Sequence, residues 1–262
     1  MRHGFSLVEL SIVLVILGLL TGGILSGQSL IRAAQLRSVV SEYQNFITAT
    51  LSFRDKYRSL PGDFKDATKF WTAADGNDGI GADCFYTIST DAATCNGNGN
   101  GLIAYSTIVS MENFRYWQHL AAAGLIEGSY SGAPTTNPIA PSTRYGLVGT
   151  NMPRSKLGST IGYYIHYSGY SDGTGPYWKG DNGHIYIMGG QETNDITEVP
   201  ILPAEEMWNI DTKLDDGRPG YGKIRTTRTN ASCVTDLSSA DVSEYNVADT
   251  SLSCYLLMQT GF

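Results

Sequence analysis

The sequence lacks the signatures of several common catalytic sites. It contains no H-E-x-x-H metalloprotease motif, no P-loop and no dinucleotide-binding G-x-G-x-x-G. The four histidines are scattered along the chain and form no recognisable triad with acidic residues. The paired carboxylates at 205–206 and 215–216 are adjacent in sequence, so their side chains point in different directions, whereas acid–base catalysis needs groups that converge on a cleft. We therefore expect that the protein is not an enzyme.

Charged residues are also scarce. Only 16% of the residues are charged, and 25 acidic against 18 basic residues give a net charge of −7 with a pI of about 5.0. An acidic chain of this kind offers no broad surface for the phosphates of nucleic acids, so we predict no nucleic-acid partner. With 30 glycines and 16 tyrosines, the composition favours a loop-rich, strand-containing extracytoplasmic domain over a helical bundle.

Cysteine is rare, and the number of cysteines is even. Cys84, Cys95, Cys233 and Cys254 allow three pairings. Their placement as two sequence-local pairs favours Cys84–Cys95 and Cys233–Cys254, each closing a polar loop in an oxidising compartment. Free buried thiols and metal ligands are the alternatives, but no C-x-x-C spacing supports a zinc site.

The longest hydrophobic run lies near the N-terminus. From Phe5 to Leu25 the chain has about 20 predominantly apolar residues, enough to cross a bilayer as a helix. One charged residue, Glu9, interrupts the run, and a carboxylate in lipid needs a partner. No basic residue of the span supplies that partner. If the chain is cleaved between Gly4 and Phe5, the new α-ammonium group of Phe5 on a neighbouring copy can pair with Glu9.

The segment MRHG followed by FSLVELSIVLVILG resembles the N-terminus of type IV pilins and type II secretion pseudopilins. The resemblance implies that a prepilin peptidase removes the basic leader Met1–Gly4 on the cytoplasmic side and that Phe5 is then N-methylated. It further implies that Glu9 sets the register between subunits and that the C-terminal bulk lies outside the cytoplasm. A secretory signal is the first alternative, but this run is longer and is interrupted early by a charge. A simple membrane anchor is the second, and it gives Glu9 no role.

Beyond the apolar run, periodicity predicts the elements of an α+β fold. A stripe of apolar residues at helical spacing extends the first helix to about Ser59, where the segment LPGD at 60–63 ends it. The other expected elements are helices over 110–128 and from 203, and strands over 161–169, 183–190 and 223–227. The blocks LPGDF, WQHLAAAGLI and IDTKLDDGRPGYG also resemble prepilin-type proteins. This resemblance implies a pilin-like fold, in which a long N-terminal helix, transmembrane in its first half, packs on an antiparallel β-sheet with disulfide-bounded loops.

Acidic residues in two loops are candidate cation ligands. Asp75, Asp78 and Asp83 lie in a Gly- and Asn-rich insertion, where their carboxylates and nearby carbonyl groups suit Ca²⁺. Their spacing does not match an EF-hand and no Glu closes the loop, so a solvated, turn-rich loop stapled by Cys84–Cys95 is the alternative. The carboxylates of the segment 215–217 (DDG) either bind a cation or cap turns.

The histidines offer no strong metal site. His119 is expected to occupy a polar helix position with no special role. His166 and His184 are expected to face each other across the hairpin of the two long strands, and without a third ligand such a pair is more typical of a sheet surface than of a metal centre.

These expectations describe a chain in three parts: a leader (1–4), a transmembrane and assembly helix (5–28) and a periplasmic pilin-like domain (29–262). We expect a single-pass inner-membrane subunit of a type IV pilus or type II secretion pseudopilus, minor rather than major because of its length. Its expected partners are other pilin or pseudopilin subunits, prepilin peptidase, the inner-membrane assembly platform and membrane lipid, with calcium as the one candidate cofactor. The alternatives are a non-polymerising, membrane-anchored domain that binds glycan or protein, and a secreted calcium-dependent lectin.

Overall fold

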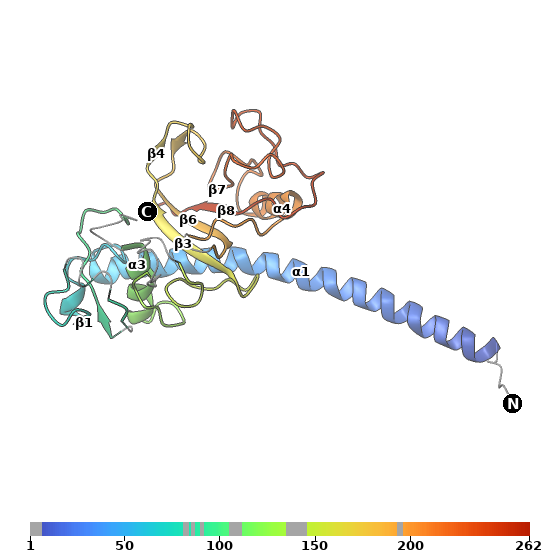
Figure 1. Cartoon of the computed structure of the whole chain (residues 1–262), viewed down its shortest axis with the longest axis horizontal. Helices are drawn as coiled ribbons and strands as arrows, with labels where there is room; N and C mark the ends of the chain where they lie inside the picture. The colour runs from blue at the N-terminus through green and yellow to red at the C-terminus, as the bar shows by residue number, and fades with distance from the viewer. Residues whose placement is uncertain are drawn as a thin grey trace.

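The computed structural model describes residues 7–80, 84, 87–89, 92–104, 112–134, 146–192 and 196–262. The helix α1 (Leu7–Tyr57) packs into a globular head with its C-terminal half and projects from the head with its N-terminal half (Figure 1). Its 51 residues correspond to about 77 Å at 1.5 Å per residue. The long helix predicted from the sequence is therefore confirmed, although it ends at Tyr57 instead of near Ser59.

The burial of α1 changes along its length. The residues that α1 buries in the head recur every three or four positions: Leu36, Val39, Glu42, Tyr43, Phe46, Ala49, Thr50 and Phe53. One stripe of the helix therefore faces the head, as the periodicity predicts. Residues 7–31, which we call the apolar arm, contribute nothing to the buried core.

The helix ends in a tight turn that requires glycine. Gly62 has a φ of +82°, which L side chains rarely adopt. A Cβ atom at this position would also lie 2.2 Å from the carbonyl oxygen of Glu112. The chain leaves the helix at Arg58, which has a φ of +57°, and Gly62 then lets the returning chain pass close to the next helix.

An antiparallel sheet forms the centre of the head. Its strand order is β3-β6-β8-β7, and every neighbouring pair is antiparallel. The strands are β3 (Ile161–Tyr167), β6 (His184–Gly190), β8 (Leu256–Gln259) and β7 (Ile224–Arg225). The remaining elements are η1 (Ala67–Lys69), β1 (Thr72–Ala73), β2 (Ala93–Thr94), α3 (Glu112–Ala122), β4 (Tyr170–Ser171), β5 (Gly180–Asp181) and α4 (Ala204–Leu214). The predicted α+β, pilin-like arrangement is confirmed.

Aromatic side chains fill the core between α1, α3 and the sheet. The ring of Phe46 on α1 lies 5.0 Å from Trp117 on α3 and 5.0 Å from Tyr163 on β3, measured between centroids. Tyr186 on β6 lies 6.1 Å from Phe46 and stacks on Trp117 at 5.7 Å. Much of the tyrosine-rich composition is thus explained by packing against the long helix.

His119 is a buried structural residue, so the prediction that it has no special role is wrong. Its Nδ1 accepts the backbone N–H of Gly62 at 2.9 Å, and its Nε2 lies 2.9 Å from the hydroxyl of Thr94. Its ring stacks on Phe53 and Trp71. Burial lowers the pKa of His119 to about 3, so the imidazole is neutral and fixes the turn after α1 without carrying charge.

The two histidines of the long strands do not face each other. In the register of β3 and β6, His166 is opposite Ile185 and His184 is opposite Tyr167. Because successive side chains of a strand point to opposite faces, His166 and His184 lie on different sides of the sheet. The Nε2 of His184 instead accepts the backbone N–H of Ile103 at 3.0 Å.

Both predicted disulfides are present. Cys84 bonds to Cys95, and Cys233 bonds to Cys254. All four cysteines are fully buried, and among the described residues no cysteine is free. The second bridge closes the C-terminal loop onto the segment that precedes β8.

A buried carboxylate attaches α1 to the head. Glu42 is 8% exposed and accepts hydrogen bonds from the hydroxyl of Tyr163 at 2.6 Å, the hydroxyl of Ser155 at 2.8 Å and the N–H of Lys156 at 2.8 Å. These donors come from β3 and from the loop before it. Because the bonds are directional, they fix both the rotation and the axial position of the helix on the sheet.

We predict that Glu42→Ala lowers the free energy of unfolding of the head by about 3 kcal/mol, since two buried hydroxyls and the N–H of Lys156 lose their acceptor. Chemical denaturation of the full chain in detergent, followed by tryptophan fluorescence, measures the change. Asn45→Ala, on the exposed side of the same helix, is the control and should stay within about 0.5 kcal/mol of wild type. Equal stability of the two variants would contradict the role given to Glu42.

Candidate functional site

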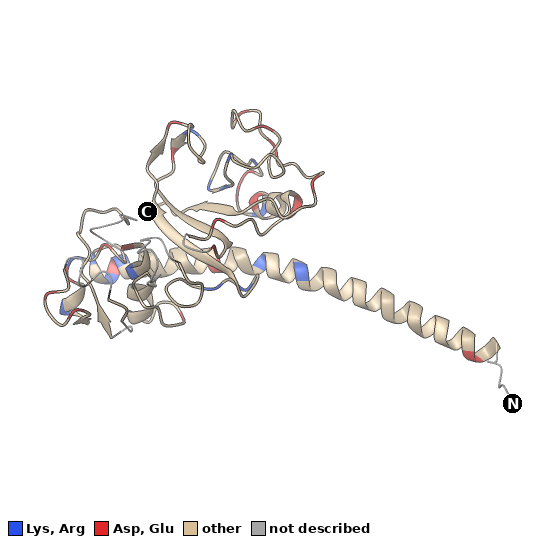
Figure 2. Cartoon of the chain, viewed as in Figure 1, with Lys and Arg blue, Asp and Glu red and all other residues tan. Residues whose placement is uncertain are grey.

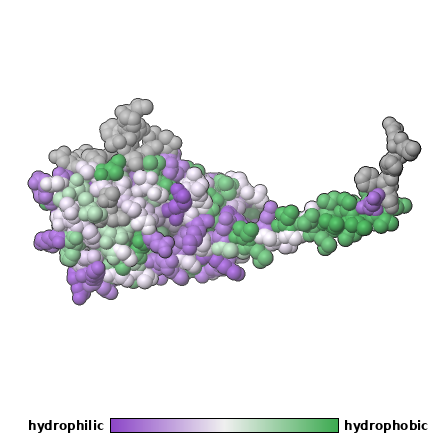
Figure 3. Space-filling view, turned by 90° about the horizontal axis from the view of Figure 1, so that it is seen from below, coloured by the Kyte–Doolittle hydropathy of each residue, from purple (hydrophilic) through white to green (hydrophobic). Residues whose placement is uncertain are grey.

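The apolar arm presents a continuous hydrophobic surface. Leu7, Leu19 and Leu30 are 86%, 74% and 71% exposed. Figure 3 shows most of the arm as hydrophobic, with a paler stretch toward the head. Soluble monomers rarely expose an apolar surface of this extent, so lipid or protein must cover it. In the described part of the chain, α1 is the helix long and apolar enough to cross a membrane.

Three hydroxyl groups of the arm are satisfied by the helix itself. The hydroxyls of Ser11, Thr21 and Ser29 donate to the carbonyl oxygens of Val8, Leu17 and Ser26, each at 2.9 Å. Hydroxyl groups bonded in this way place no unsatisfied donor in lipid. The helix also continues without a break through Gly18, Gly22, Gly23 and Gly27.

Glu9 is the charged residue of the arm. It lies in the first turn of α1, where the helix dipole favours a negative charge. Figure 2 shows this single acidic position near the end of the arm, far from the charged groups of the head. Gly4 and Phe5, the predicted cleavage and methylation positions, lie outside the described residues.

An ion pair holds α4 against α1 where the arm leaves the head. The guanidinium of Arg32 donates from Nε to Glu206 at 2.7 Å and from Nη2 to the second oxygen at 2.5 Å. This bidentate geometry fixes the pair more firmly than a single contact would. Arg32 is the first basic residue after the apolar run, so the clamp marks the boundary between the arm and the head.

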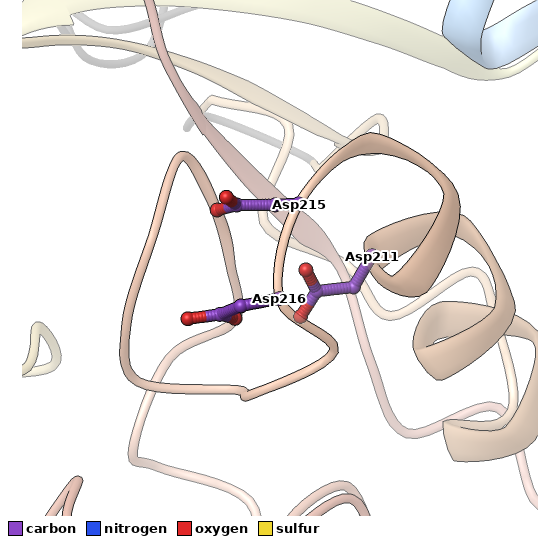
Figure 4. A group of neighbouring side chains, drawn as sticks. All are labelled: Asp211, Asp215 and Asp216. Carbon is purple, nitrogen blue, oxygen red and sulfur yellow. The ribbon is translucent and has the colours of Figure 1, made fainter.

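Three carboxylates converge at the C-terminal end of α4. Asp211 points toward the turn that carries Asp215 and Asp216 (Figure 4), and one oxygen of each lies within 4.8 Å of the others. Asp211 is fully buried and accepts the hydroxyl of Tyr245 at 2.8 Å. Burial raises the pKa of Asp211 to about 7, and the charges of Asp216 and Asp215 contribute to the rise.

The same carboxylates also cap the turn. Asp211 accepts the N–H of Gly217 at 3.2 Å, and Asp215 accepts the N–H groups of Lys223 and Ile224. A Cβ atom on Gly222 would collide with the Asp215 carboxylate, so glycine lets the chain approach this closely. Turn capping accounts for the conformation, and the oxygen-rich group has the chemistry that a hard cation such as Ca²⁺ prefers.

The predicted calcium ligands of the insertion are arranged as turn caps. Asp75 accepts the N–H groups of Asn77 and Gly79, and Asp78 accepts that of Ile80. Within the described ranges, neither belongs to a group of three metal-ligating side chains. Asp83 lies outside those ranges, so calcium binding by the insertion stays a prediction.

Gly169–Gly173 reads G-Y-S-D-G and matches the spacing of the serine hydrolase motif G-x-S-x-G. In those enzymes the serine sits on a sharp turn between a strand and a helix. Here Ser171 belongs to the two-residue strand β4, and its hydroxyl donates to the carbonyl of Tyr177 at 3.2 Å. The segment therefore lacks the local structure of a nucleophile elbow.

Comparison with known proteins identifies the N-terminal segment. Residues 1–25 match the model of the prokaryotic N-terminal methylation motif. The chain has a pilin-type N-terminus. This motif is typical of type IV pilins and pseudopilins, in which it continues into a long apolar helix. No curated protein and no solved structure matches the chain significantly.

Two features of the chain were not predicted from the sequence. The Arg32–Glu206 pair joins residues 174 positions apart, and no local pattern connects them. The association of Asp211 with Asp215 and Asp216 did have a signal, because residues four apart on a helix lie on the same face. That spacing places Asp211 one turn before the DDG segment.

We predict that Asp211 makes the head less stable as the pH rises from about 4 to about 7. The pKa of Asp211 is raised in the folded state, so the unfolded chain releases this proton at a lower pH than the folded chain does. Between the two pKa values the free energy of unfolding therefore falls as the pH rises, by at most about 1.4 kcal/mol per pH unit. Asp211→Asn should flatten the profile between pH 5 and 7, measured by urea unfolding with a chelator present. Half-buried Asp249, which bonds to Ser251 in a turn, provides the control variant Asp249→Asn, which should keep the wild-type slope. An unchanged slope in Asp211→Asn would refute the prediction.

Proposed function

We propose that the chain is a subunit of a type IV pilus or a type II secretion pseudopilus. Prepilin peptidase cleaves it between Gly4 and Phe5, and the mature chain assembles through α1 with other pilin or pseudopilin subunits on an inner-membrane platform. The observation that carries the proposal is a methylation motif that leads directly into an exposed apolar arm on a folded, disulfide-bonded head. The length of 262 residues favours a minor subunit.

The dimensions of the arm fit a membrane-held precursor. Residues 7–31 extend for about 37 Å as a helix, and the hydrocarbon core of a bilayer is about 30 Å thick. The head would then lie on the extracytoplasmic side, where an oxidising environment supports the disulfides Cys84–Cys95 and Cys233–Cys254. Lipid covers the arm before assembly.

Assembly exchanges lipid for protein around the arm. Lipid tails are as apolar as leucine, so this exchange supplies little hydrophobic driving force. A charge pair in the same low-dielectric region is strong and sensitive to position. Glu9 of one subunit and the α-ammonium group of Phe5 on its neighbour therefore set the register that apolar contacts leave undefined.

We predict that the mature protein begins with N-methylated Phe5 in cells that contain the prepilin peptidase. Mass spectrometry of the N-terminal peptide measures both the cleavage and the added methyl group. A strain without the peptidase provides the control, and its protein should keep Met1–Gly4. An intact N-terminus in both strains would instead support a membrane-anchored binding domain that does not polymerise, and a start near Gly27 would support a secreted lectin.

We predict that Glu9→Ala lowers incorporation into filaments at least about tenfold, since the neighbouring ammonium group loses its partner inside the bundle. Filaments sheared from cells and quantified against the membrane pool by immunoblotting give the measure. Ser11→Ala is the matched control, because the Ser11 hydroxyl bonds only within its own helix turn and its loss should leave incorporation unchanged. Normal incorporation of Glu9→Ala would remove the charge pair from the assembly mechanism.

A further inference from the structure

A cavity of about 630 Å³ lies in the head, well away from the arm. Its floor is β3, where Tyr164 and His166 alternate with Tyr163, whose ring faces α1. The cavity is therefore on the sheet face opposite the long helix. The β4–β5 hairpin, which Figure 1 shows on the far side of the sheet from α1, forms one wall. Its volume is typical of a small-ligand site.

Aromatic rings line much of this cavity. The ring of His166 lies 5.6 Å from Tyr164 and 6.3 Å from Tyr177, so three rings form a continuous surface from the sheet to the hairpin. Tyr170 on β4 lines the cavity as well, and it is 67% exposed. A large, solvent-exposed tyrosine is not explained by core packing, although burial explains Tyr164.

Two carboxylates also line the cavity. Asp172 and Glu198 are on the lining, whereas none of its described residues is lysine or arginine. Asp172 is held in place because its Oδ1 accepts both the N–H and the hydroxyl of Thr174, at 2.8 and 2.7 Å. These bonds lower the pKa of Asp172, and the charge of nearby Lys179 adds to the effect, so its carboxylate stays ionised near neutral pH.

We propose that this cavity binds an alkylammonium group, either a choline-type head group or the side chain of a lysine. Tyrosine faces attract a cation through the ring quadrupole, and a nearby carboxylate adds Coulomb attraction. A phosphate or carboxylate ligand would be repelled by Asp172 and Glu198, and none of the described lining residues is a lysine or arginine that would offset this repulsion. A neutral sugar could stack on the rings but would gain nothing from the net negative charge.

The ligand test uses the full chain in a polyoxyethylene detergent, which carries neither sugar nor ammonium groups. Ligand-observed NMR titrations compare choline, Nα-acetyl-lysine methylamide, methyl glucoside and neohexanol, the uncharged carbon isostere of choline. We expect at least one of the two ammonium probes to bind, and choline, if bound, to bind about tenfold more tightly than neohexanol. The stronger of the two ammonium probes identifies the source of the group.

Matched variants connect binding to the named residues. Tyr170→Leu removes the ring face and keeps apolar bulk, so affinity for the bound ammonium should fall about threefold to tenfold, whereas Tyr170→Phe should retain it. Asp172→Asn removes one charge and should weaken binding to a similar extent. Asp249→Asn is the control, because Asp249 makes the same pair of bonds to Ser251 outside the cavity.

Each outcome of these experiments either supports or overturns the proposal. Ammonium binding that depends on Tyr170 and Asp172 supports the proposal. Binding of methyl glucoside without ammonium binding, equal binding of choline and neohexanol, or no binding of any probe overturns it. So does ammonium binding that survives both Tyr170→Leu and Asp172→Asn. Because these variants are remote from the arm, their filament incorporation should be normal, and failure of one proposal leaves the other testable.

Discussion

The whole architecture depends on one helix that lies in two different environments. The half of α1 that contains Val39, Phe46 and Phe53 is part of the core of the head, and the half before Arg32 is covered only by what surrounds the molecule. Since the helix is continuous, any force or rotation applied to the arm reaches the head directly. The junction must therefore resist both sliding and turning.

Apolar packing alone does not provide that resistance. Hydrophobic contacts are non-directional, so a stripe of leucine, valine and phenylalanine tolerates small shifts of the helix. The hydrogen bonds of Glu42 and the bidentate Arg32–Glu206 pair are directional, and they hold α1 at two levels about 15 Å apart along its axis. Taking charged groups out of water costs desolvation energy, so the intact groups add little net stability, whereas removing one partner is destabilising because the other is left unpaired. Their main effect on the fold is to specify one geometry.

Sequence reasoning recovered the features that depend on local pattern. The helical stripe of α1, the alternation of β3 and β6 and the sequence-local cysteine pairs are each determined by near neighbours, and the structure confirms them. It failed where the partner is distant: His119 binds a turn 57 residues away, and Arg32 binds Glu206 on another helix. The histidines of the hairpin were misassigned because a shift of one residue in register changes the face of every side chain.

The distribution of polar chemistry separates assembly from recognition. The arm holds one carboxylate, and the hydroxyls of Ser11, Thr21 and Ser29 are satisfied within the helix, so most of its surface suits lipid or other apolar helices. The cavity lies on the opposite face of the sheet, and the acidic group of Asp211 lies at the end of α4. If the chain assembles through its arm, as proposed, the arms become buried against one another. A ligand site on the face opposite α1 therefore stays accessible after assembly, which a site beside the arm would not.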